Sequence, residues 1–362
     1  MSDPRTKFPR PSFRDKCILV VGGAGFIGSN LVLRLLEDDP SQVIIVDNLL
    51  SSELVNIPIN PHVRFMAGSI ADDLILRDIP DALDYVFHLA CFHGNQSSIA
   101  DPIADHANNT LTSLKLFERL KDLRPLKKVV YAAAGCAVAK KTQDEPAATP
   151  EDAPPELFHD SPYAISKLIG ELYGNYYFVR HNLPFVKARF QNVYGPREIL
   201  GAGRWRGTVH TVWRNVTPTF VFKALHQEAL PLFNAGEDGR DFIFVDDVVE
   251  GLTRAAAYGV PGEAYNIASG SEIRIRDLAA LINRLTDNPT PPEMLPPREW
   301  DRSGRRFGDP TKSLRTIGFS CSVDIETGLR QTVDWTRANL DVILRCLSRH
   351  AHRMPELSKY LL

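Results

Sequence analysis

The sequence is poor in cysteine, and its few cysteines follow no metal-binding or disulfide pattern. None of them forms a Cys-x-x-Cys pair, and their number is odd, which argues against both a zinc site and a disulfide framework. We therefore expect no metal and a reducing, cytoplasmic environment. The five cysteines are Cys17, Cys91, Cys136, Cys321 and Cys346.

Long hydrophobic runs and net charge are also missing. No apolar run approaches the roughly 20 residues that span a membrane. Lys and Arg number 42 against 44 Asp and Glu, a formal net charge of −2, so nothing in the overall charge favours nucleic acid or a membrane surface as a partner. The polar, proline-bearing segment 1–15 lacks the apolar core of a secretory signal and is predicted to be a flexible arm.

A glycine-rich turn joins the first predicted strand to the first predicted helix. The apolar run 17–21 leads into Gly22-Gly-Ala-Gly25-Phe-Ile-Gly28, and a second apolar run ends at Asp47. Glycines let the backbone approach a pyrophosphate at a helix N-terminus, and the acidic residue can bind both ribose hydroxyls of adenosine. Because Asp47 would repel a 2′-phosphate, these residues predict NAD rather than NADP.

Strands and helices then alternate along the chain. This order predicts an α/β fold, namely a Rossmann-type doubly wound parallel sheet with a smaller mixed α/β substrate-binding lobe. The predicted strands lie at 43–46, 63–67, 85–90, 128–132 and 185–190, with helices at 103–123 and 162–181. The predicted units are the arm (1–15), the Rossmann domain (16–191, with sheet contributions from about 238–267), the substrate-binding lobe (192–237 and 268–345) and a C-terminal tail (346–362).

Tyr163 and Lys167 form the most suggestive pair of chemical groups. They stand four positions apart in a predicted helix, so they share one face, about one turn from each other. A lysine ammonium there stabilises the tyrosine phenolate, which can then accept a proton from a substrate hydroxyl. This spacing also arises by chance, so the catalytic role depends on the motifs elsewhere in the chain.

In combination, the motifs resemble the extended short-chain dehydrogenase/reductase family, specifically its NAD-dependent nucleotide-sugar epimerases and dehydratases. The resemblance runs from about residue 16 to 340. It rests on GGAGFIG (22–28), VDN (46–48), FHLA (87–90), YAISK (163–167), RFQNVYGP (189–196) and RDFIFVDDV (240–248).

The resemblance implies a catalytic centre and an NAD site. It makes Tyr163 the general base and Lys167 the residue that supports it and holds the nicotinamide ribose. Ser69 replaces the aspartate that usually precedes the position of Ile70 beside the adenine. The implied NAD contacts are Gly22, Gly25, Phe26, Ile27, Gly28, Asp47, Asn48, Ile70, Leu89, Ala90, Asn109, Tyr163 and Lys167.

The substrate implied is a nucleoside-diphosphate sugar, linked to UDP, GDP, CDP or dTDP. Arginines in the second half suit its diphosphate, since guanidinium groups bind phosphate oxygens in pairs. The substrate contacts that we expect are Ala134, Asn192, Arg206, Asn215, Arg240 and Arg298.

The chain departs from the family beside the catalytic pair. Where the family has a Ser or Thr that hydrogen-bonds the reacting hydroxyl, this chain has Ala134. Cys136 resembles the catalytic cysteine of GDP-mannose 3,5-epimerases, in which a thiol and a basic residue act on opposite faces of the sugar. Arg206 stands near that basic residue's place, but because guanidinium does not release a proton, it is better suited to binding a phosphate or carboxylate. Simple space filling at Cys136, and a solvated surface position for the arginines around Arg206, remain open.

These residues predict an NAD-dependent epimerase that works through a transient 4-keto intermediate. The same oxidation also begins two alternatives, an NDP-sugar decarboxylase and a 4,6-dehydratase, although dehydratases usually carry Asp-Glu where this chain has Gly135 and Cys136. A non-catalytic NAD- or NDP-sugar-binding protein is a further alternative because Ala134 lacks a hydroxyl. The family's usual pairing of helices 103–123 and 162–181 implies a homodimer.

Overall fold

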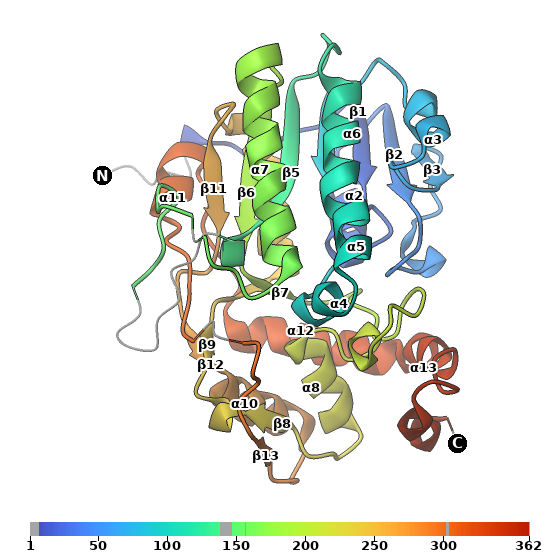
Figure 1. Ribbon diagram of the computed structural model, residues 1–362, viewed down its shortest axis with the longest axis vertical. Helices are drawn as coiled ribbons and strands as arrows, with labels where there is room; N and C mark the ends of the chain where they lie inside the picture. Colours follow the sequence, from blue (N-terminus) through green and yellow to red (C-terminus); the bar gives the residue numbers. More distant parts are fainter. Residues whose placement is uncertain (1–6, 138–146, 156, 302–303, 362) are drawn as a thin grey trace.

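A seven-stranded parallel sheet forms the centre of the molecule (Figure 1). The computed structural model describes residues 7–137, 147–155, 157–301 and 304–361. The strand order is β11-β6-β5-β4-β1-β2-β3, which confirms the predicted Rossmann-type fold and puts the topological switch between β1 and β4. The strands are β1 (Cys17–Val21), β2 (Gln42–Asp47), β3 (Val63–Ala67), β4 (Tyr85–His88), β5 (Lys128–Ala134), β6 (Phe185–Phe190) and β11 (Ala264–Ile267).

Helices cover both faces of the sheet. On one face Phe117 of α6 and Tyr177 of α7 pack against strand residues such as Leu19. On the other face Val32 of α2 and Leu252 of α9 pack in a separate apolar cluster. Complete burial of such a side chain contributes about 1.5–3 kcal/mol, so the two clusters fix the helices against the sheet. The helices are α2 (Phe26–Leu36), α3 (Asp73–Asp78), α6 (Leu111–Leu120), α7 (Pro162–His181), α9 (Val245–Tyr258) and α11 (Thr311–Ile317).

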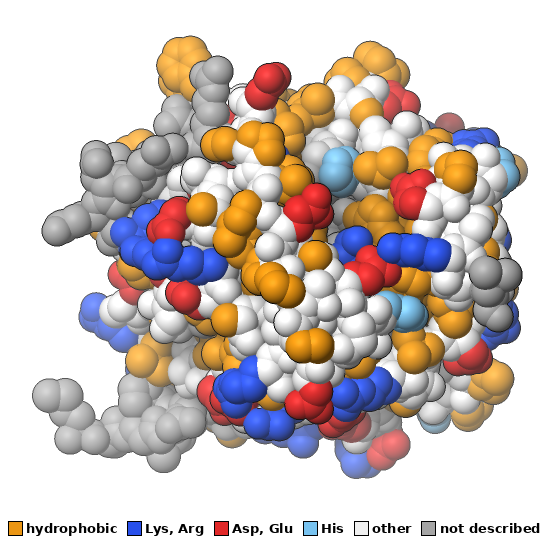
Figure 2. Space-filling view, turned by 90° about the horizontal axis from the view of Figure 1, so that it is seen from below, with side chains coloured by type: hydrophobic (Ala, Val, Ile, Leu, Met, Phe, Trp, Pro, Cys, Tyr) orange, Lys and Arg blue, Asp and Glu red, His pale blue; other side chains and the backbone are white. Residues whose placement is uncertain are grey.

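The smaller lobe lies below the sheet in Figure 1 and has its own apolar core. Phe220, Leu278 and Val333 meet there from three helices. Figure 2 shows acidic and basic side chains interspersed on the face of the molecule seen from below. The elements are α8 (Val216–Leu225), α10 (Ile275–Thr286), α12 (Ile325–Ala338), and the strand pairs β7 (Asn192–Tyr194) with β10 (Phe242–Phe244), β8 (Pro231–Phe233) with β13 (Glu293–Leu295), and β9 (Gly239–Arg240) with β12 (Ile273–Arg274).

Short helices connect these elements and line the region between them. They are η1 (Leu54–Asn56), α4 (Asn95–Ala100), α5 (Pro102–Asp105), η2 (His106–Thr110), η3 (Gly135–Ala137), η4 (Val209–Thr211) and η5 (Asn234–Gly236). The single helix that we expected at 103–123 is thus divided into α5, η2 and α6, with a π-turn over η2.

Both ends of the described chain are more firmly packed than the sequence suggested. From Lys7 onward the expected flexible arm lies against the body of the protein, where Phe13 is buried and Tyr258 donates to the carbonyl of Pro9. The expected tail takes in only the end of α13 (Leu340–Ser348), which begins in the predicted lobe, and all of η6 (Pro355–Tyr360). Leu347 and Leu357 are fully buried in a cluster with the loop 199–213. Burial of these apolar side chains explains why the ends fold back. They are too few to form a periodic pattern, so the sequence did not predict this packing.

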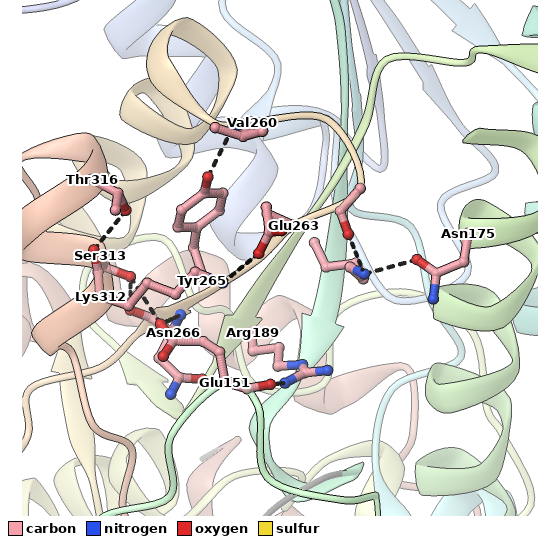
Figure 3. A network of polar contacts seen from close by, with 12 residues as sticks. Glu151, Asn175, Arg189, Val260, Glu263, Tyr265, Asn266, Lys312, Ser313 and Thr316 are labelled. Carbon is pink, nitrogen blue, oxygen red and sulfur yellow. Dashed lines mark hydrogen bonds and ion pairs between the residues drawn. The ribbon is translucent and has the colours of Figure 1, made fainter. Parts of the chain in front are cut away.

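A polar network joins the far edge of the sheet to two loops (Figure 3). Arg189 of β6 donates to both carboxylate oxygens of Glu171 at 2.9 and 2.7 Å and to the carbonyl of Glu151 at 2.7 Å. The Asn266 backbone N–H donates to Glu151 Oε1, and its amide donates to the carbonyls of Thr149 and Asp309. The network therefore fixes the segments around Thr149 and Asp309 beside the carboxyl ends of β6 and β11.

No helix among the residues that the structure describes is long and apolar enough to cross a membrane. Within the same residues there is no cluster of three or more His, Cys, Asp or Glu side chains that could hold a metal ion.

Candidate active site

A cleft of about 850 Å³ lies at the carboxyl ends of the parallel strands. Residues that end or follow β1, β2, β4, β5 and β6 form one wall, and residues of α8 and of the segment 297–306 form another. This is the edge of the sheet at which doubly wound folds collect ligands.

The turn between β1 and α2 requires glycine at two positions, because a side chain there would collide with neighbouring backbone atoms. Gly22 has φ 87°, and a β-carbon there would lie 2.5 Å from the backbone nitrogen of Ala90. A β-carbon at Gly28 would collide with the carbonyl oxygen of Gly22. Helix α2 begins after Gly25 with no side-chain cap, so its first N–H groups are available to an anion. The turn therefore has room for a pyrophosphate, and Gly22, Gly25, Phe26, Ile27 and Gly28 all line the cleft.

Asp47 ends β2 on the cleft wall, next to Asn48. Its carboxylate accepts hydrogen bonds from Ala24 N at 3.1 Å, Leu49 N at 2.9 Å and Ser52 Oγ at 2.8 Å. Burial raises the pKa of Asp47, and these hydrogen bonds oppose that rise by favouring the ionised form. Ile70 lies on the same part of the wall. The carboxylate is held rigidly and keeps acceptor capacity for ribose hydroxyls.

Two of the three residues expected around the nicotinamide line the cleft. Leu89 and Ala90 do so directly, whereas Asn109 is not among the lining residues. The side chain of Asn109 accepts from Phe92 N at 2.6 Å and donates to Asp105 Oδ1 at 2.7 Å and Ser166 Oγ at 3.1 Å. In the structure Asn109 therefore ties the loop after β4 to α7.

Tyr163 and Lys167 both lie on the cleft wall, one turn apart at the start of α7. The helix begins there because Ser161 caps it by accepting from Ala164 N, and Pro162 occupies its first turn. Lys167 Nζ donates to the Ala132 carbonyl at 2.8 Å and lies 5.9 Å from the centre of the Tyr163 ring. Because Lys167 is buried, this hydrogen bond keeps its ammonium group beside the phenol.

Ala134 is the last residue of β5 and lines the cleft with a methyl group, which can make no hydrogen bond. The backbone of Cys136 belongs to η3, but its side chain lies outside the described part of the structure. At the end of β5 the cleft therefore lacks the hydroxyl group that the family's Ser or Thr would supply.

Arg206, a predicted substrate contact, is buried in the loop before α8 and is not among the residues that line the cleft. Its Nη1 donates to the carbonyl of His93 at 2.9 Å, while Nε and Nη2 have no partner among the described residues. Burial lowers the pKa of Arg206 to about 9, and burial together with the Arg206 charge lowers that of His93 to about 3. The His93 ring lies 5.9 Å from the Tyr163 ring. An unpaired buried cation costs several kcal/mol, so an anion at this place would be strongly stabilised.

Glu198, which is buried, and Asn215 form a hydrogen-bonded pair on the wall of the cleft. The amide of Asn215 donates to Glu198 Oε1, and Glu198 Oε2 has no partner in the described chain. Burial raises the pKa of Glu198 to about 7, so near neutral pH much of it is an uncharged acid able to donate a hydrogen bond.

The far end of the cleft combines arginines with aromatic rings. Arg240 donates to the Gly239 carbonyl at 2.8 Å and pairs with Asp301 at 3.3 Å. Burial lowers the pKa of Arg240 to about 10. The Arg298 guanidinium lies 4.0 Å from the Phe233 ring centre and 6.0 Å from that of Trp300. Asn192, at the start of β7, lines the cleft between this end and Tyr163.

Comparison with known proteins identifies the family. The model of the NAD dependent epimerase/dehydratase family matches residues 18–268. The chain belongs to that family. A curated relative, the UDP-glucose 4-epimerase of Mycolicibacterium smegmatis, is 32% identical over 88% of this chain and 98% of its own length. The dTDP-glucose 4,6-dehydratase of Streptomyces antibioticus is 31% identical over 89% of this chain and 92% of its own length.

Solved structures extend the similarity. The Bordetella bronchiseptica enzyme WbmF in complex with NAD+ and UDP is 56% identical, with a TM-score of 0.85, over 94% of this chain and 98% of that chain. The UDP-N-acetylglucosamine 4-epimerase of Methanobrevibacter ruminantium M1 is 28% identical, with a TM-score of 0.79, over 90% and 99%. This NAD-dependent epimerase/dehydratase family member is therefore an enzyme of the epimerase class, and its cofactor is NAD.

Neither Glu198 nor His93 was predicted from the sequence as a site residue. Both line the cleft of this epimerase-family enzyme. The position of Glu198, just after the N-x-Y-G-P motif, was the available signal. His93 gave no signal beyond following a strand, because only the packing of Arg206 and Tyr163 reveals its place.

Proposed function

We propose that the protein epimerises a UDP-sugar by oxidising and re-reducing C4 of the sugar. The observation that carries the proposal is the position of Tyr163 and Lys167. They line the same cleft as the glycine turn that fits the NAD pyrophosphate and the arginines that suit a sugar nucleotide. Uridine is the proposed base because a relative 56% identical over nearly the whole chain was solved with UDP.

In the proposed reaction Tyr163 accepts the proton of the C4 hydroxyl. The ammonium of Lys167, held by the Ala132 carbonyl, stabilises the phenolate that accepts it. NAD, when bound, supplies the hydride acceptor at C4. The 4-keto sugar then either turns over in the cleft and is reduced on its other face, or loses and regains a proton at a neighbouring carbon. For that second route, Cys136 and His93 are the proposed groups that remove and return the proton.

Separate residues are proposed to hold the two ends of the substrate. Arg240 and Arg298 bind the diphosphate, with Asn192 and Asn215 between them and the sugar. Arg206 binds an anionic or strongly polar substituent on the sugar, because its two unpartnered nitrogens lack a counter-ion among the described residues. Ala134 contributes only a methyl contact to the sugar.

An NDP-sugar decarboxylase is the second candidate, and Arg206 is the observation that favours it. A carboxylate held there would sit near Tyr163, since Arg206 binds the backbone of His93 and His93 packs against Tyr163. A 4-keto sugar uronate loses carbon dioxide readily at the adjacent carbon. Nothing in the described residues favours the 4,6-dehydratase in the same way.

A panel of UDP-sugars tests the proposal and separates the two candidates. We expect at least one of UDP-glucose, UDP-N-acetylglucosamine and a UDP-uronate to raise the melting temperature of the NAD-loaded protein and to form bound NADH transiently. Mass spectrometry then distinguishes an isomer of unchanged mass from a product that has lost carbon dioxide. Binding of UDP-sugars with neither NADH nor product would contradict the proposal.

We further propose a cytoplasmic homodimer. Helices α6 and α7 expose apolar side chains on adjoining surfaces, and Leu111, Leu172, Tyr176 and Val179 are 40%, 57%, 55% and 79% exposed. Two copies paired through these helices would bury that surface. Cys17, Cys91, Cys321 and Cys346 are unpaired, in keeping with a reducing compartment.

A further inference from the structure

Gln191 follows β6 on the cleft wall, beside the end of β5 that carries Ala134. Strands β5 and β6 are in register with Ala134 opposite Phe190, so the next residues, Gly135 and Gln191, lie side by side where both strands end. Gln191 lines the cleft together with Ala134, Tyr163 and Asn192.

The Gln191 amide packs directly on the backbone of Gly135. A β-carbon at Gly135 would lie 2.7 Å from Gln191 Cδ, 2.8 Å from Oε1 and closer still to Nε2. A β-carbon at Gly308 would lie 2.9 Å from the same Nε2. The amide therefore fills a slot between two glycines, and any larger residue at either position would displace it.

The Gly308 side of this slot is held in place by hydrogen bonds. Gly308 N donates to Asp241 Oδ2 at 3.2 Å, and Gly308 forms a β-bridge with Thr149. The network of Arg189, Glu151 and Asn266 anchors the same segments (Figure 3). An amide fixed in this way loses little conformational entropy when it binds substrate.

Within the described residues the Gln191 amide has no hydrogen-bond partner, and because Gln191 lines the cleft, its N–H groups and carbonyl can bind a ligand there. We infer that Gln191 takes the place of the family's Ser or Thr by donating a hydrogen bond to the C4 oxygen of the substrate sugar. This inference rests on the proposed C4 oxidation.

In that step the C4–H and O–H bonds break and the C4=O bond forms. Hydride reduces NAD+ to NADH, and the proton passes to Tyr163. Gln191 exchanges no atom with the substrate. Its N–H groups orient the hydroxyl before transfer and bind the developing carbonyl, a role for which fixed amide donors are suited.

The test mixes NAD-loaded protein with the UDP-sugar that gives the largest wild-type NADH signal and follows the rate of NADH formation. Gln191→Ala should lower that rate by about 10². Gln191→Glu keeps the packing in the slot but removes both N–H donors, so it should lose a similar factor at pH 8 and recover as the carboxyl group becomes protonated at lower pH. Ala134→Ser should restore most of the rate in the Gln191→Ala background.

A purely structural role gives a different pattern. Gln191→Glu would then keep the wild-type rate at every pH, and Ala134→Ser would rescue nothing. Either result, or an unchanged rate in Gln191→Ala, overturns the inference. Failure of the wild type to form NADH with any UDP-sugar would instead overturn the proposed function. Melting temperature and bound NAD, measured for every variant, should stay at wild-type values.

Discussion

Tyr163 is the residue on which the proposed chemistry depends. Tyr163→Phe keeps the ring but removes the proton acceptor, so the epimerisation rate should fall by about 10²–10⁴. NAD should remain bound, because the glycine turn and Asp47 are unchanged. The measurements are turnover of the identified UDP-sugar and the NAD content of the purified protein.

Tyr85→Phe is the matched control for that variant. Tyr85 lies at the start of β4, at the opposite end of the strand from the cleft. Its loss of a hydroxyl should leave turnover unaffected. Wild-type turnover in Tyr163→Phe would exclude Tyr163 as the base.

Glu198 gives a second residue-scale prediction, through pH. Burial raises its pKa from an ordinary 4.5 to about 7. Between these values folded Glu198 holds a proton that it has released in the unfolded chain, so its contribution to stability falls as pH rises from about 4.5 to 7 and then stays level. Glu198→Gln removes this dependence.

We expect Glu198→Gln to match the wild type near pH 4.5 and to be more stable by about 1–3 kcal/mol above pH 7. Urea unfolding across this range, without UDP-sugar, measures the difference. A difference that does not change with pH would mean that Glu198 titrates normally.

At this scale the sequence predicted residues that belong to local motifs. Asp47, Tyr163 and Lys167 could be placed because each follows from spacing within one strand or helix. The burial of Arg206 could not, since it depends on contacts with His93 and Thr211 and on packing against a distant C-terminal segment. Gln191 belongs to the motif at 189–196, but its position beside Gly135 could not be predicted, because it depends on the register between β5 and β6.

At the scale of elements, the strands were the most predictable feature. Central parallel strands are buried on both faces, so they read as continuous apolar runs such as β1 and β5. Helix α13 and the turn η6 were missed as packed elements because only a few of their side chains are buried. Their role is to hold the loop 199–213, which carries Arg206.

Leu347→Ala tests that role. Leu347 is fully buried, and its Cδ2 packs on Gly201, where a β-carbon would lie 3.1 Å away. The variant should lose about 2–5 kcal/mol of stability and bind the UDP-sugar more weakly, with NAD binding retained. Urea unfolding and titrations with both ligands provide the readout.

Leu74→Ala, at a side chain 66% exposed on α3, serves as the control and should change stability by less than about 0.5 kcal/mol. Equal weakening of NAD and UDP-sugar binding by Leu347→Ala would indicate general destabilisation and contradict a specific bracing role.

For the whole molecule, the proposed dimer can be tested separately from catalysis. Leu172→Glu together with Val179→Glu places charges on the exposed apolar surface of α7 and should convert the dimer into a monomer. Light scattering coupled to size exclusion measures the mass. Leu74→Glu, on a different helix, should leave it unchanged, and a monomeric wild type would disprove the dimer.

The central claim is that Tyr163, Lys167 and bound NAD oxidise C4 of a UDP-sugar within this cleft. Its most direct test is rapid mixing of the NAD-loaded protein with a UDP-sugar that is deuterated at C4. We predict transient NADH whose rate of appearance falls on deuteration, and no NADH from Tyr163→Phe. Product formed without NADH and without an isotope effect would contradict the account.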